Sequence, residues 1–374
     1  MESMSSCRPS TSVLRFDFRC IMKNRNVFNN EFLKVYFFTP KVDSNDPIFG
    51  HSLDWIREIA AQADSLKVLA VHLSSSSPKI DSRIDFEEIG GGDFAKRTRG
   101  FLKLIQIGLD IFCSRKKQPI VFYHMIKEPG MILGLPLKLL GVRQVLWYSH
   151  SSKSFGLKMV HRFVNQVFTP TQESYPIASK KVRVVGHGIN SQLFNLTTTT
   201  SNYSRNGIIS VGRISKIKKL EKLVQAMNGI NENVNLIGPI FDTDYYFELV
   251  KLSSNLEVDV TFSGVSSYES MPTLFLTSKI CYSGSPRTLD KSAVQAAMSG
   301  CFVVSEENSA LDSVGMSEIW KQLGFVAPPK LNVQIQVLLE MDDSEQELLR
   351  RQLALISTKR HSLDNLIKHI LFSN

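Results

Sequence analysis

The segment from Cys281 to Glu306 places charged side chains where a predicted strand leads into a predicted helix. Its sequence, CYSGSPRTLDKSAVQAAMSGCFVVSE, indicates a short strand, a polar loop, a helix that begins near Asp290 and Lys291, and a second apolar strand. The first turn of a helix exposes unpaired backbone N–H groups and the positive end of the helix dipole, and both attract anions. The segment therefore predicts an anion site. Asp290 could instead serve only as the helix cap, and both interpretations stay open.

Two more cations follow a predicted strand in the run GIISVGRISKIKKLEKLVQAM, which begins at Gly207. Arg213 lies directly after the strand, and Lys218 lies five residues further on, at the start of an amphipathic helix. A guanidinium offers a planar fork of donors and an ammonium offers a compact charge, so the two together suit a diphosphate. Taken alone, the pattern is more typical of two exposed surface cations.

Histidines end two predicted strands in the first half of the chain. His124 closes PIVFYH, and His150 closes QVLWYSH between the hydroxyl groups of Ser149 and Ser151. Ligands approach a parallel sheet at the carboxyl ends of its strands, so both imidazoles could contact a ligand. A structural role is the alternative for each histidine. Glu128, which follows His124 closely, is a further candidate for contact with a ligand.

Short apolar runs alternate with helical patterns from Leu33 onward, which is typical of βαβ units and a parallel sheet. In the first half the predicted strands occupy 33–38, 66–71, 119–124, 144–149, 166–171 and 182–186. The predicted helices between them occupy 51–62, 97–114, 130–140, 154–164 and 171–178. The polar run at 195–206 has the composition of a linker or an exposed loop.

The same alternation restarts after this polar run. The predicted strands of the second half occupy 207–212, 234–238, 258–264, 279–283, 301–305 and 324–327. The predicted helices occupy 218–228, 243–253, 268–277, 290–299 and 331–341. Two α/β halves of comparable length predict two parallel-sheet domains, with a ligand site at the carboxyl ends of their strands and in the cleft between them.

Together these motifs resemble the family 4 glycosyltransferases, the retaining enzymes of group 1 type with the GT-B fold. The likeness runs from about residue 33 to about residue 326. Arg213 and Lys218 match the family's GR…K element, which binds the donor diphosphate, and QAAMSGCFVV at 295–304 is similar to its AMAxGxPVV-like run. The resemblance implies an α/β fold with two Rossmann-like parallel-sheet domains that face each other across a cleft.

Two further segments carry the resemblance. FFTPKVDSNDPIFG at 37–50 is similar to the family's first strand and donor-facing loop, with Gly50 at the glycine position. VVGHGIN at 184–190 resembles the segment that joins the two domains, and we expect His187 within it to be a hinge or packing residue. The implied boundaries are a flexible tail at 1–31, an acceptor domain at 32–187, a donor domain at 188–360 and a C-terminal helix at 361–374 that could return to the first domain.

The resemblance assigns expected roles to individual residues. The catalytic positions are His150, Arg213 and Lys218. The donor-binding positions are Gly50, Arg213, Lys218, Gly264, Asp290, Lys291 and Gln295. The acceptor-binding positions are His124 and Glu128. We expect no metal and no cofactor, because the nucleotide-diphosphate sugar is a co-substrate and GT-B enzymes generally need no metal.

The sequence departs from the family pattern at two positions. Family members carry a Glu-x7-Glu element, but here Arg287 and Gln295 occupy the places of the two glutamates. The second glutamate contacts the ribose hydroxyls of the nucleotide. A glutamine amide can still accept and donate hydrogen bonds to a ribose, although it lacks the charge-assisted strength of a carboxylate. The substitution therefore predicts weaker donor binding, by about 1 kcal/mol or more, without loss of the chemistry.

The composition of the chain is that of a globular protein, with 43% hydrophobic and 21% charged residues in 374. Five scattered cysteines without CxxC pairing predict a reducing cytoplasm, with neither a disulfide framework nor a zinc site.

Residues 1–188 carry 27 Lys and Arg against 16 Asp and Glu, whereas the rest carry 17 against 19. The basic first half predicts an anionic partner, although an ordinary solvated surface is an equal alternative. Nucleic acid is not expected, because no recognisable binding module is present.

The basic first half also contains KRTRGFLKLIQIGLDIFCSRKK at 96–117, where apolar residues recur at helical spacing between two groups of cations. This pattern suits a helix that lies on an anionic membrane, but it is more typical of a core-facing helix with charged ends. We found no uninterrupted apolar run of transmembrane length and no signal peptide, and Met22 is an alternative start to Met1. The predicted location is cytoplasmic, with peripheral contact at the inner face of the membrane.

The sequence therefore predicts a glycosyltransferase that moves a hexose-type sugar from a nucleotide-diphosphate donor to a glycan or lipid-linked acceptor, with retention of configuration. Surface polysaccharide or glycolipid synthesis is the expected setting. The alternative is a degenerate GT-B protein that binds a glycan or a partner subunit without catalysis. The departures at 287 and 295 favour this alternative, whereas the presence of Arg213, Lys218 and His150 favours the enzyme.

Overall fold

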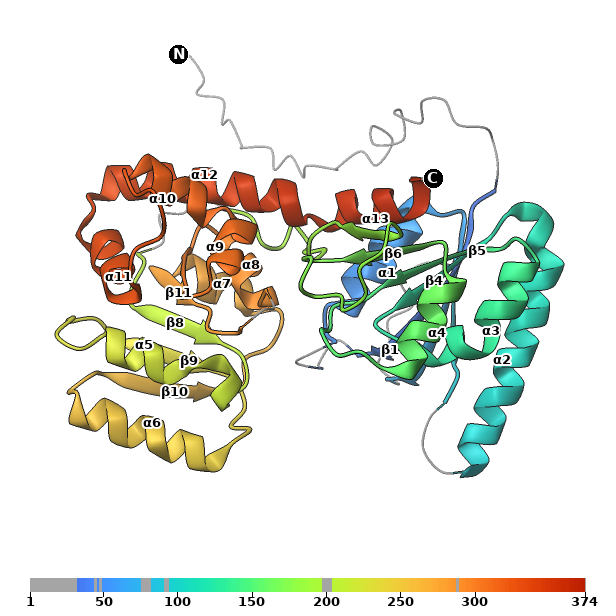
Figure 1. Cartoon of the computed structure of the whole chain (residues 1–374), viewed down its shortest axis with the longest axis horizontal. Helices are drawn as coiled ribbons and strands as arrows, with labels where there is room; N and C mark the ends of the chain where they lie inside the picture. The colour runs from blue at the N-terminus through green and yellow to red at the C-terminus, as the bar shows by residue number, and fades with distance from the viewer. Residues whose placement is uncertain are drawn as a thin grey trace, which may run out of the picture. The chain divides into compact units, whose positions relative to one another are not determined.

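The computed structural model describes residues 32–43, 46, 49–74, 82–90, 94–196, 204–286 and 289–373. The predicted tail at 1–31 and the substituted position Arg287 lie outside these residues. Among the helices that the structure describes, none combines the length and the apolar character that crossing a membrane requires. Two parallel sheets organise the chain from Leu33 onward (Figure 1).

The first sheet has seven parallel strands in the order β3-β2-β1-β4-β5-β6-β7. The strands are β1 (Lys34–Val42), β2 (Ser65–Leu73), β3 (Ile84–Glu88), β4 (Ile120–His124), β5 (Arg143–Trp147), β6 (Gln166–Thr169) and β7 (Val182–Val184). In the centre, Val35 of β1 pairs with Leu66 of β2 on one side and with Ile120 of β4 on the other. The chain order therefore reverses between β1 and β4, as it does in doubly wound sheets.

Both faces of this sheet are buried, and alternate side chains of β1 pack on opposite faces. Val35 and Phe37 point into an apolar cluster with α1 (Ser52–Gln62) and α13 (Leu363–Phe372). Tyr36 and Phe38, which alternate with them, point into a second cluster on the opposite face. Three helices contribute to that second cluster: α2 (Phe94–Ser114), α3 (Glu128–Leu139) and α4 (Phe155–Phe163). A short 3-10 helix, η2 (Arg115–Lys117), follows α2.

The second sheet has five parallel strands in the order β10-β9-β8-β11-β12. The strands are β8 (Ile208–Val211), β9 (Val234–Ile237), β10 (Val260–Gly264), β11 (Ile280–Tyr282) and β12 (Phe302–Val304). The helical elements that accompany this sheet are η3 (Lys216–Lys218), α5 (Leu220–Ala226), α6 (Thr243–Asn255), α7 (Met271–Leu276), α8 (Lys291–Met298), α9 (Asn308–Val314), α10 (Met316–Gln322), α11 (Leu331–Glu340) and α12 (Asp343–His361). One apolar cluster forms the core of this domain. The two parallel-sheet, Rossmann-like domains confirm the predicted fold class.

The chain passes between the two domains twice, and the two connections lie side by side. Ile189 forms an isolated parallel bridge with Ser362, and its backbone N–H donates to the His361 carbonyl at 2.8 Å. Gly188 has a φ of +66°, and a Cβ there would lie 2.7 Å from Cζ2 of Trp55. After this contact α13 packs against α1 in the first domain, so the last helix is part of the first domain's core (Figure 1).

Two predicted elements are wrong. Residues 171–178 form turns and bends instead of a helix, because Thr171 and Ser174 hydrogen-bond each other and their local backbone, and Pro176 follows. Residues 324–327 form no strand, since Gly324 adopts a left-handed φ of +85° and Phe325 donates back to the Trp320 carbonyl at the end of α10. The other predicted strands all appear, with shifted ends.

Candidate functional site

The candidate site lies where the strand order of the second sheet reverses, between β8 and β11. Gly212 and Arg213 follow β8 directly, and Ser283 follows β11. In open α/β sheets the crevice outside the carboxyl ends of the strands at such a reversal is the usual ligand site. The cations predicted from the sequence therefore belong to the part of this domain where a ligand is expected.

Lys218 and Asp290 form an ion pair at this position. The Lys218 ammonium lies 2.6 Å from Oδ1 of Asp290, and the two side chains are only 16% and 13% exposed. Oδ2 of the same carboxylate accepts a hydrogen bond of 2.9 Å from the Ser283 hydroxyl. Asp290 occupies the cap position of α8, but its side chain makes no cap hydrogen bond. The alternative that Asp290 only caps its helix is therefore wrong, because its carboxylate is used by Lys218 and Ser283.

Small residues make room for Lys218. A Cβ at Gly212 would lie 3.0 Å from Cε of Lys218, and a Cβ at Gly284 would overlap the Lys218 backbone carbonyl. Gly212 also has a φ of +150°, a conformation that side chains rarely adopt. The two glycines follow β8 and β11, the neighbouring strands between which the strand order reverses, so the sequence places its least bulky residues around the paired lysine.

Arg213 has a different environment from Lys218. Its side chain is exposed, and its guanidinium lies 5.1 Å from the ring centroid of Phe241, which is itself exposed. Among the described residues, no carboxylate lies within ion-pair distance of this guanidinium. Arg213 is therefore accessible to an anionic ligand, whereas Lys218 would have to share its charge with Asp290.

Gln295 is buried, with 4% of its surface exposed, and its side chain lies near the hydroxyl of Tyr268. The same hydroxyl donates to Oδ2 of Asp54 in α1 at 2.8 Å. Burial and the neighbouring Asp54 carboxylate raise the pKa of Tyr268, so its hydroxyl keeps its proton as the donor. Gln295 thus lies in a polar cluster whose other members are Tyr268 and Asp54.

Lys291 joins this cluster through the aromatic ring of Tyr268. Its ammonium lies 5.1 Å from the ring centroid, within the range of a cation–π contact. Desolvation lowers the pKa of Lys291 to about 7, although the Asp54 carboxylate opposes that shift. The amine is therefore only partly charged at neutral pH, and an anion that bound beside it would favour its protonated form.

His124 is fully buried in an aromatic cluster at the end of β4. Its imidazole stacks on Phe37 at 5.5 Å and on Trp147 at 5.3 Å, and the Trp55 ring centroid lies 4.5 Å away. Nδ1 lies 3.2 Å from the Thr39 hydroxyl. Desolvation first, and then the charge of a nearby lysine, lower the pKa of His124 to about 3. The imidazole is neutral, and its acceptor-binding role remains a prediction.

The other predicted site residues of the first domain lie at its surface or in its loops. His150 is exposed, and its Nδ1 accepts a hydrogen bond of 3.1 Å from the Ser152 backbone. Glu128 is exposed at the first turn of α3, where Oε2 accepts from the Lys127 backbone at 3.2 Å. Gly50 is buried and donates its backbone N–H to a carbonyl at 2.8 Å. Among the described residues, none of these three forms a hydrogen bond or an ion pair with Lys218 or Asp290.

Gly264 ends β10 with a φ of +68°, and a Cβ there would meet no atom within 4 Å. Its carbonyl accepts a hydrogen bond of 2.6 Å from the Gly238 backbone, which fixes the end of the strand. The open space beside Gly264 leaves room for a ligand to approach the backbone. Its donor-binding role remains a prediction.

His187 lies in the first connection between the two domains. Its Nε2 donates to the Leu289 carbonyl at 2.9 Å, and its backbone N–H donates to Nδ1 of His361 at 3.3 Å. Desolvation, followed by the neighbouring His361, lowers the pKa of His187 to about 3. A neutral imidazole that bonds the residue before Asp290 fits the expected hinge and packing role.

Tyr268 and Asp54 are residues of this site that sequence reasoning missed. Asp54 belongs to the first turn of α1, directly after the loop that contains Gly50. An acid in the first turn after β1 lies at the carboxyl edge of the first sheet, and that placement could have identified it. Tyr268 precedes a helix in the run SSYES, which carries no recognisable signal.

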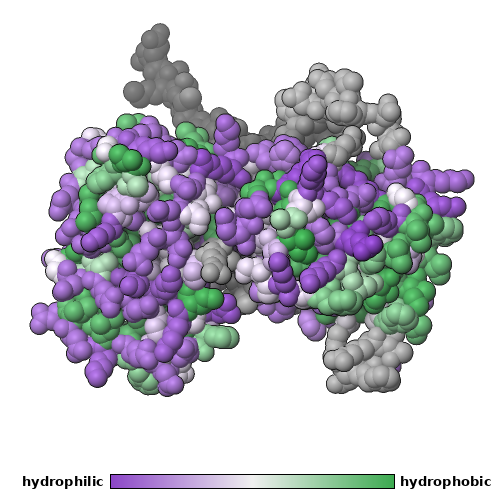
Figure 2. Space-filling model, in the orientation of Figure 1, coloured by the Kyte–Doolittle hydropathy of each residue, from purple (hydrophilic) through white to green (hydrophobic). Residues whose placement is uncertain are grey.

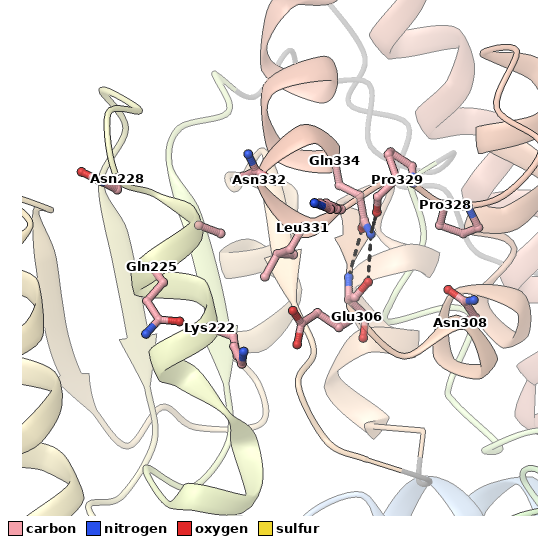
Figure 3. A pocket seen from close by; sticks show the side chains of 13 residues that line it. Lys222, Gln225, Asn228, Glu306, Asn308, Pro328, Pro329, Leu331, Asn332 and Gln334 are labelled. Carbon is pink, nitrogen blue, oxygen red and sulfur yellow. Dashed lines mark hydrogen bonds between the residues drawn. The ribbon is translucent and has the colours of Figure 1, made fainter.

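A separate pocket of about 670 Å³ lies in the second domain, beside α5 and the start of α11 (Figure 3). Lys222 and Gln225 of α5 and Glu306 line it, and Gln334 holds one wall by hydrogen bonds to the backbone of Ser305 and Pro329. None of the residues predicted to bind the donor lines this pocket. In the described part of the chain, no group of three or more His, Cys, Asp and Glu side chains could hold a metal ion.

Comparison with solved structures shows which fold this is. HepE of Anabaena in complex with UDP superposes with a TM-score of 0.67 at 15% identity, over 90% of this chain and 98% of that one. A glycosyltransferase of Rickettsia africae gives 0.65 at 14% identity, over 92% and 100%. WaaG, a glycosyltransferase involved in lipopolysaccharide biosynthesis, gives 0.58 at 10% identity, over 91% and 100%. The fold is GT-B.

Comparison of the amino-acid sequence identifies no related family or protein. No family model matches the chain, and no curated protein matches it significantly. At identities near 15% the solved structures establish the architecture of both domains, and the activity has to be argued from the site.

Proposed function

We propose that this GT-B protein is a glycosyltransferase, a hexosyltransferase of the retaining family 4 type. It transfers a hexose-type sugar from a nucleotide-diphosphate donor to a glycan or lipid-linked acceptor in the cytoplasm, for a surface polysaccharide or a glycolipid. One observation carries the proposal: Lys218, paired with Asp290, and the accessible Arg213 both follow β8 at the strand reversal of the second sheet.

The proposed chemistry uses these cations on the leaving group. Breaking the bond between the sugar's anomeric carbon and the phosphate oxygen leaves negative charge on the diphosphate, and Arg213 and Lys218 would stabilise that charge. Asp290 would accept hydroxyl groups of the sugar as Lys218 turns to the diphosphate. Lys291 would take up a proton and add a third cation, and no metal ion is required for this charge balance.

The proposed acceptor lies on the side of the first domain. His150 and Glu128 are exposed there, so both can reach a ligand without rearrangement of the core. Transfer with retention places the acceptor oxygen on the face that the diphosphate leaves, and correct placement accounts for much of the rate. Structures of HepE hold UDP, UDP and glucose, or UDP-glucose, so a UDP-sugar is the first donor to test.

Isothermal titration with UDP tests the donor proposal. We expect binding to the wild-type protein and loss of binding in Arg213→Ala and in Lys218→Ala. Lys216→Ala is the matched control, because Lys216 lies on the same η3 turn but pairs with Glu248 at 3.2 Å in an exposed position. Equal affinity for wild type, both variants and the control would contradict the assignment, and GDP should be titrated in parallel.

The competing function is a non-catalytic GT-B protein that binds a glycan or a partner subunit. The burial of Gln295 beside Tyr268 favours it, because little of the side chain that is expected to contact ribose is exposed to a ligand. A thermal-shift screen with UDP-, GDP-, ADP- and CMP-sugars separates the two functions. A shift with one donor supports the enzyme, and we then expect Gln295→Glu to keep or tighten binding. No shift with any donor supports the non-catalytic protein.

A further inference from the structure

Helix α2 presents an apolar stripe that no part of the described structure covers. Phe101, Leu102, Ile105, Leu109 and Phe112 are each between 38% and 60% exposed. At about 100° per residue these five positions fall on one arc of the helix, roughly 100° wide. The buried positions Leu104, Ile107 and Ile111 fall on a neighbouring arc that faces the sheet. The stripe is therefore a second apolar face beside the one that forms the core.

Helix α3 continues this stripe. Ile132, Leu135 and Leu139 are 37%, 48% and 79% exposed, and Leu140 follows at 39%. The two helices pack where a Cβ on Gly108 of α2 would lie 3.1 Å from the Leu133 side chain of α3. By the helical periodicity, the exposed apolar arc of each helix borders this contact, so the two arcs meet. We call these nine residues the α2–α3 apolar surface, and Figure 2 shows apolar side chains gathered over these helices.

The segment that forms α2, η2 and α3 carries mostly positive charge. Residues 99–139 contain seven Lys and Arg against two Asp and Glu. One of the two acids, Asp110, is engaged on the other side of α2, where its Oδ2 accepts from the Tyr36 hydroxyl at 2.8 Å and pairs with Lys34. The three cations of η2 are exposed at the end of α2, and the Arg115 guanidinium lies 3.9 Å from the Phe112 ring centroid.

We propose that the α2–α3 apolar surface docks on an anionic lipid bilayer. The apolar side chains enter the boundary between headgroups and acyl chains, and the cations of η2 contact the headgroup phosphates. A second copy of the chain fits less well, because a two-fold contact through this surface would bring the cations of one copy against those of the other. The docking goes beyond the proposed transfer reaction and does not depend on it.

Vesicle sedimentation of the full chain tests the docking. We expect the protein to sediment with vesicles of phosphatidylcholine and phosphatidylglycerol, much less with phosphatidylcholine alone, and less as the salt concentration rises. The double variant Leu109→Ser/Leu139→Ser should lower the partition coefficient at least about tenfold, because two buried leucine side chains are lost from the lipid contact. Lys116→Glu/Lys117→Glu should weaken binding to the anionic vesicles alone.

The matched control is Leu348→Ser/Leu355→Ser on α12, where the two leucines are 58% and 62% exposed. Sedimentation of this control should equal that of wild type, and titration of UDP should give the same affinity for all the variants. Wild type that stays in the supernatant with anionic vesicles would overturn the proposal, as would equal loss in the two leucine variants. A dimer in sedimentation velocity that Leu109→Ser/Leu139→Ser dissociates would also overturn it, because a second copy would then be the occupant.

Discussion

The Tyr268 hydroxyl donates a hydrogen bond of 2.8 Å to the Asp54 carboxylate, although the two residues are 214 positions apart. Asp54 belongs to the first helix of the first domain, and Tyr268 belongs to the segment before α7 in the second domain. The bond connects residues that follow β1 in one sheet to residues near the predicted donor site in the other. The side chain of Gln295 lies near the same hydroxyl.

Removing the Tyr268 hydroxyl should destabilise the folded protein, because the bond to Asp54 is lost. We expect Tyr268→Phe to lower the free energy of unfolding by about 1 kcal/mol, or somewhat more because Asp54 is largely buried. Urea denaturation measures the change. Tyr246→Phe is the control, because the described structure gives its hydroxyl no hydrogen-bond partner and its ring packs on Phe262. Equal losses in the two variants would show that the bond to Asp54 contributes nothing.

The lowered pKa of Lys291 predicts a pH dependence of stability. The group titrates at about 7 in the folded chain and near 10.5 when unfolded, so between these values the unfolded state binds more protons. The free energy of unfolding should therefore rise as the pH increases from about 7 toward about 10.5. Urea denaturation across this range measures the rise, and Lys291→Met should remove part of it. An identical pH profile in the variant would mean that Lys291 titrates normally in the folded state.

Three buried histidines predict a loss of folding stability at acidic pH. Desolvation lowers the pKa of His124 and of His187 to about 3, and that of His361 to about 4. Unfolded histidines take up protons near 6.5, so stability should fall as the pH drops from about 6.5 toward 4. NMR of the imidazole ring carbons should show three histidines that are still neutral at about pH 5. Titration of all the histidines near 6.5 would contradict this burial.

A substitution at Gly284 tests whether the position of Lys218 matters for ligand binding. A Cβ there would overlap the Lys218 carbonyl, so Gly284→Ala should displace the lysine and weaken any ligand that it binds, with a stability loss of about 1–3 kcal/mol. Gly229→Ala is the control for an added methyl group, since it has open space and only its φ of +78° opposes the change. Titration of UDP and thermal unfolding of both variants measure the difference.

The sequence predicted both parallel sheets because their central strands are buried on two faces and read as continuous apolar runs. It missed β3, whose sequence IDFEE holds three acids and looks like a loop. In the structure Lys67 on the neighbouring β2 pairs with Asp85 and Glu87, and these ion pairs offset the repulsion along an edge strand. The compensating charge lies 18 residues or more away in sequence, so no local pattern could show it.

The sequence predicted the types of residue in the candidate site. It predicted less well which neighbours these residues contact and how deeply they are buried. Strand ends and helix starts placed Lys218 and Asp290 near an anion site, but nothing local indicated that they pair with each other. The same limit holds for His124, whose place at a strand end suggested contact with a ligand. Its burial depends on Trp55 from α1 and Trp147 from β5, and only the folded chain brings these rings around it.

The return of α13 to the first domain sets an order of assembly during synthesis. Five of its side chains are buried beside Trp55 and β1, yet the ribosome makes them only after the whole second domain. The first seven strands therefore emerge with the apolar cluster on one face of their sheet incomplete. That face stays partly uncovered until the last helix is synthesised. Domains usually fold in the order of their synthesis, but here the first-made domain is completed last.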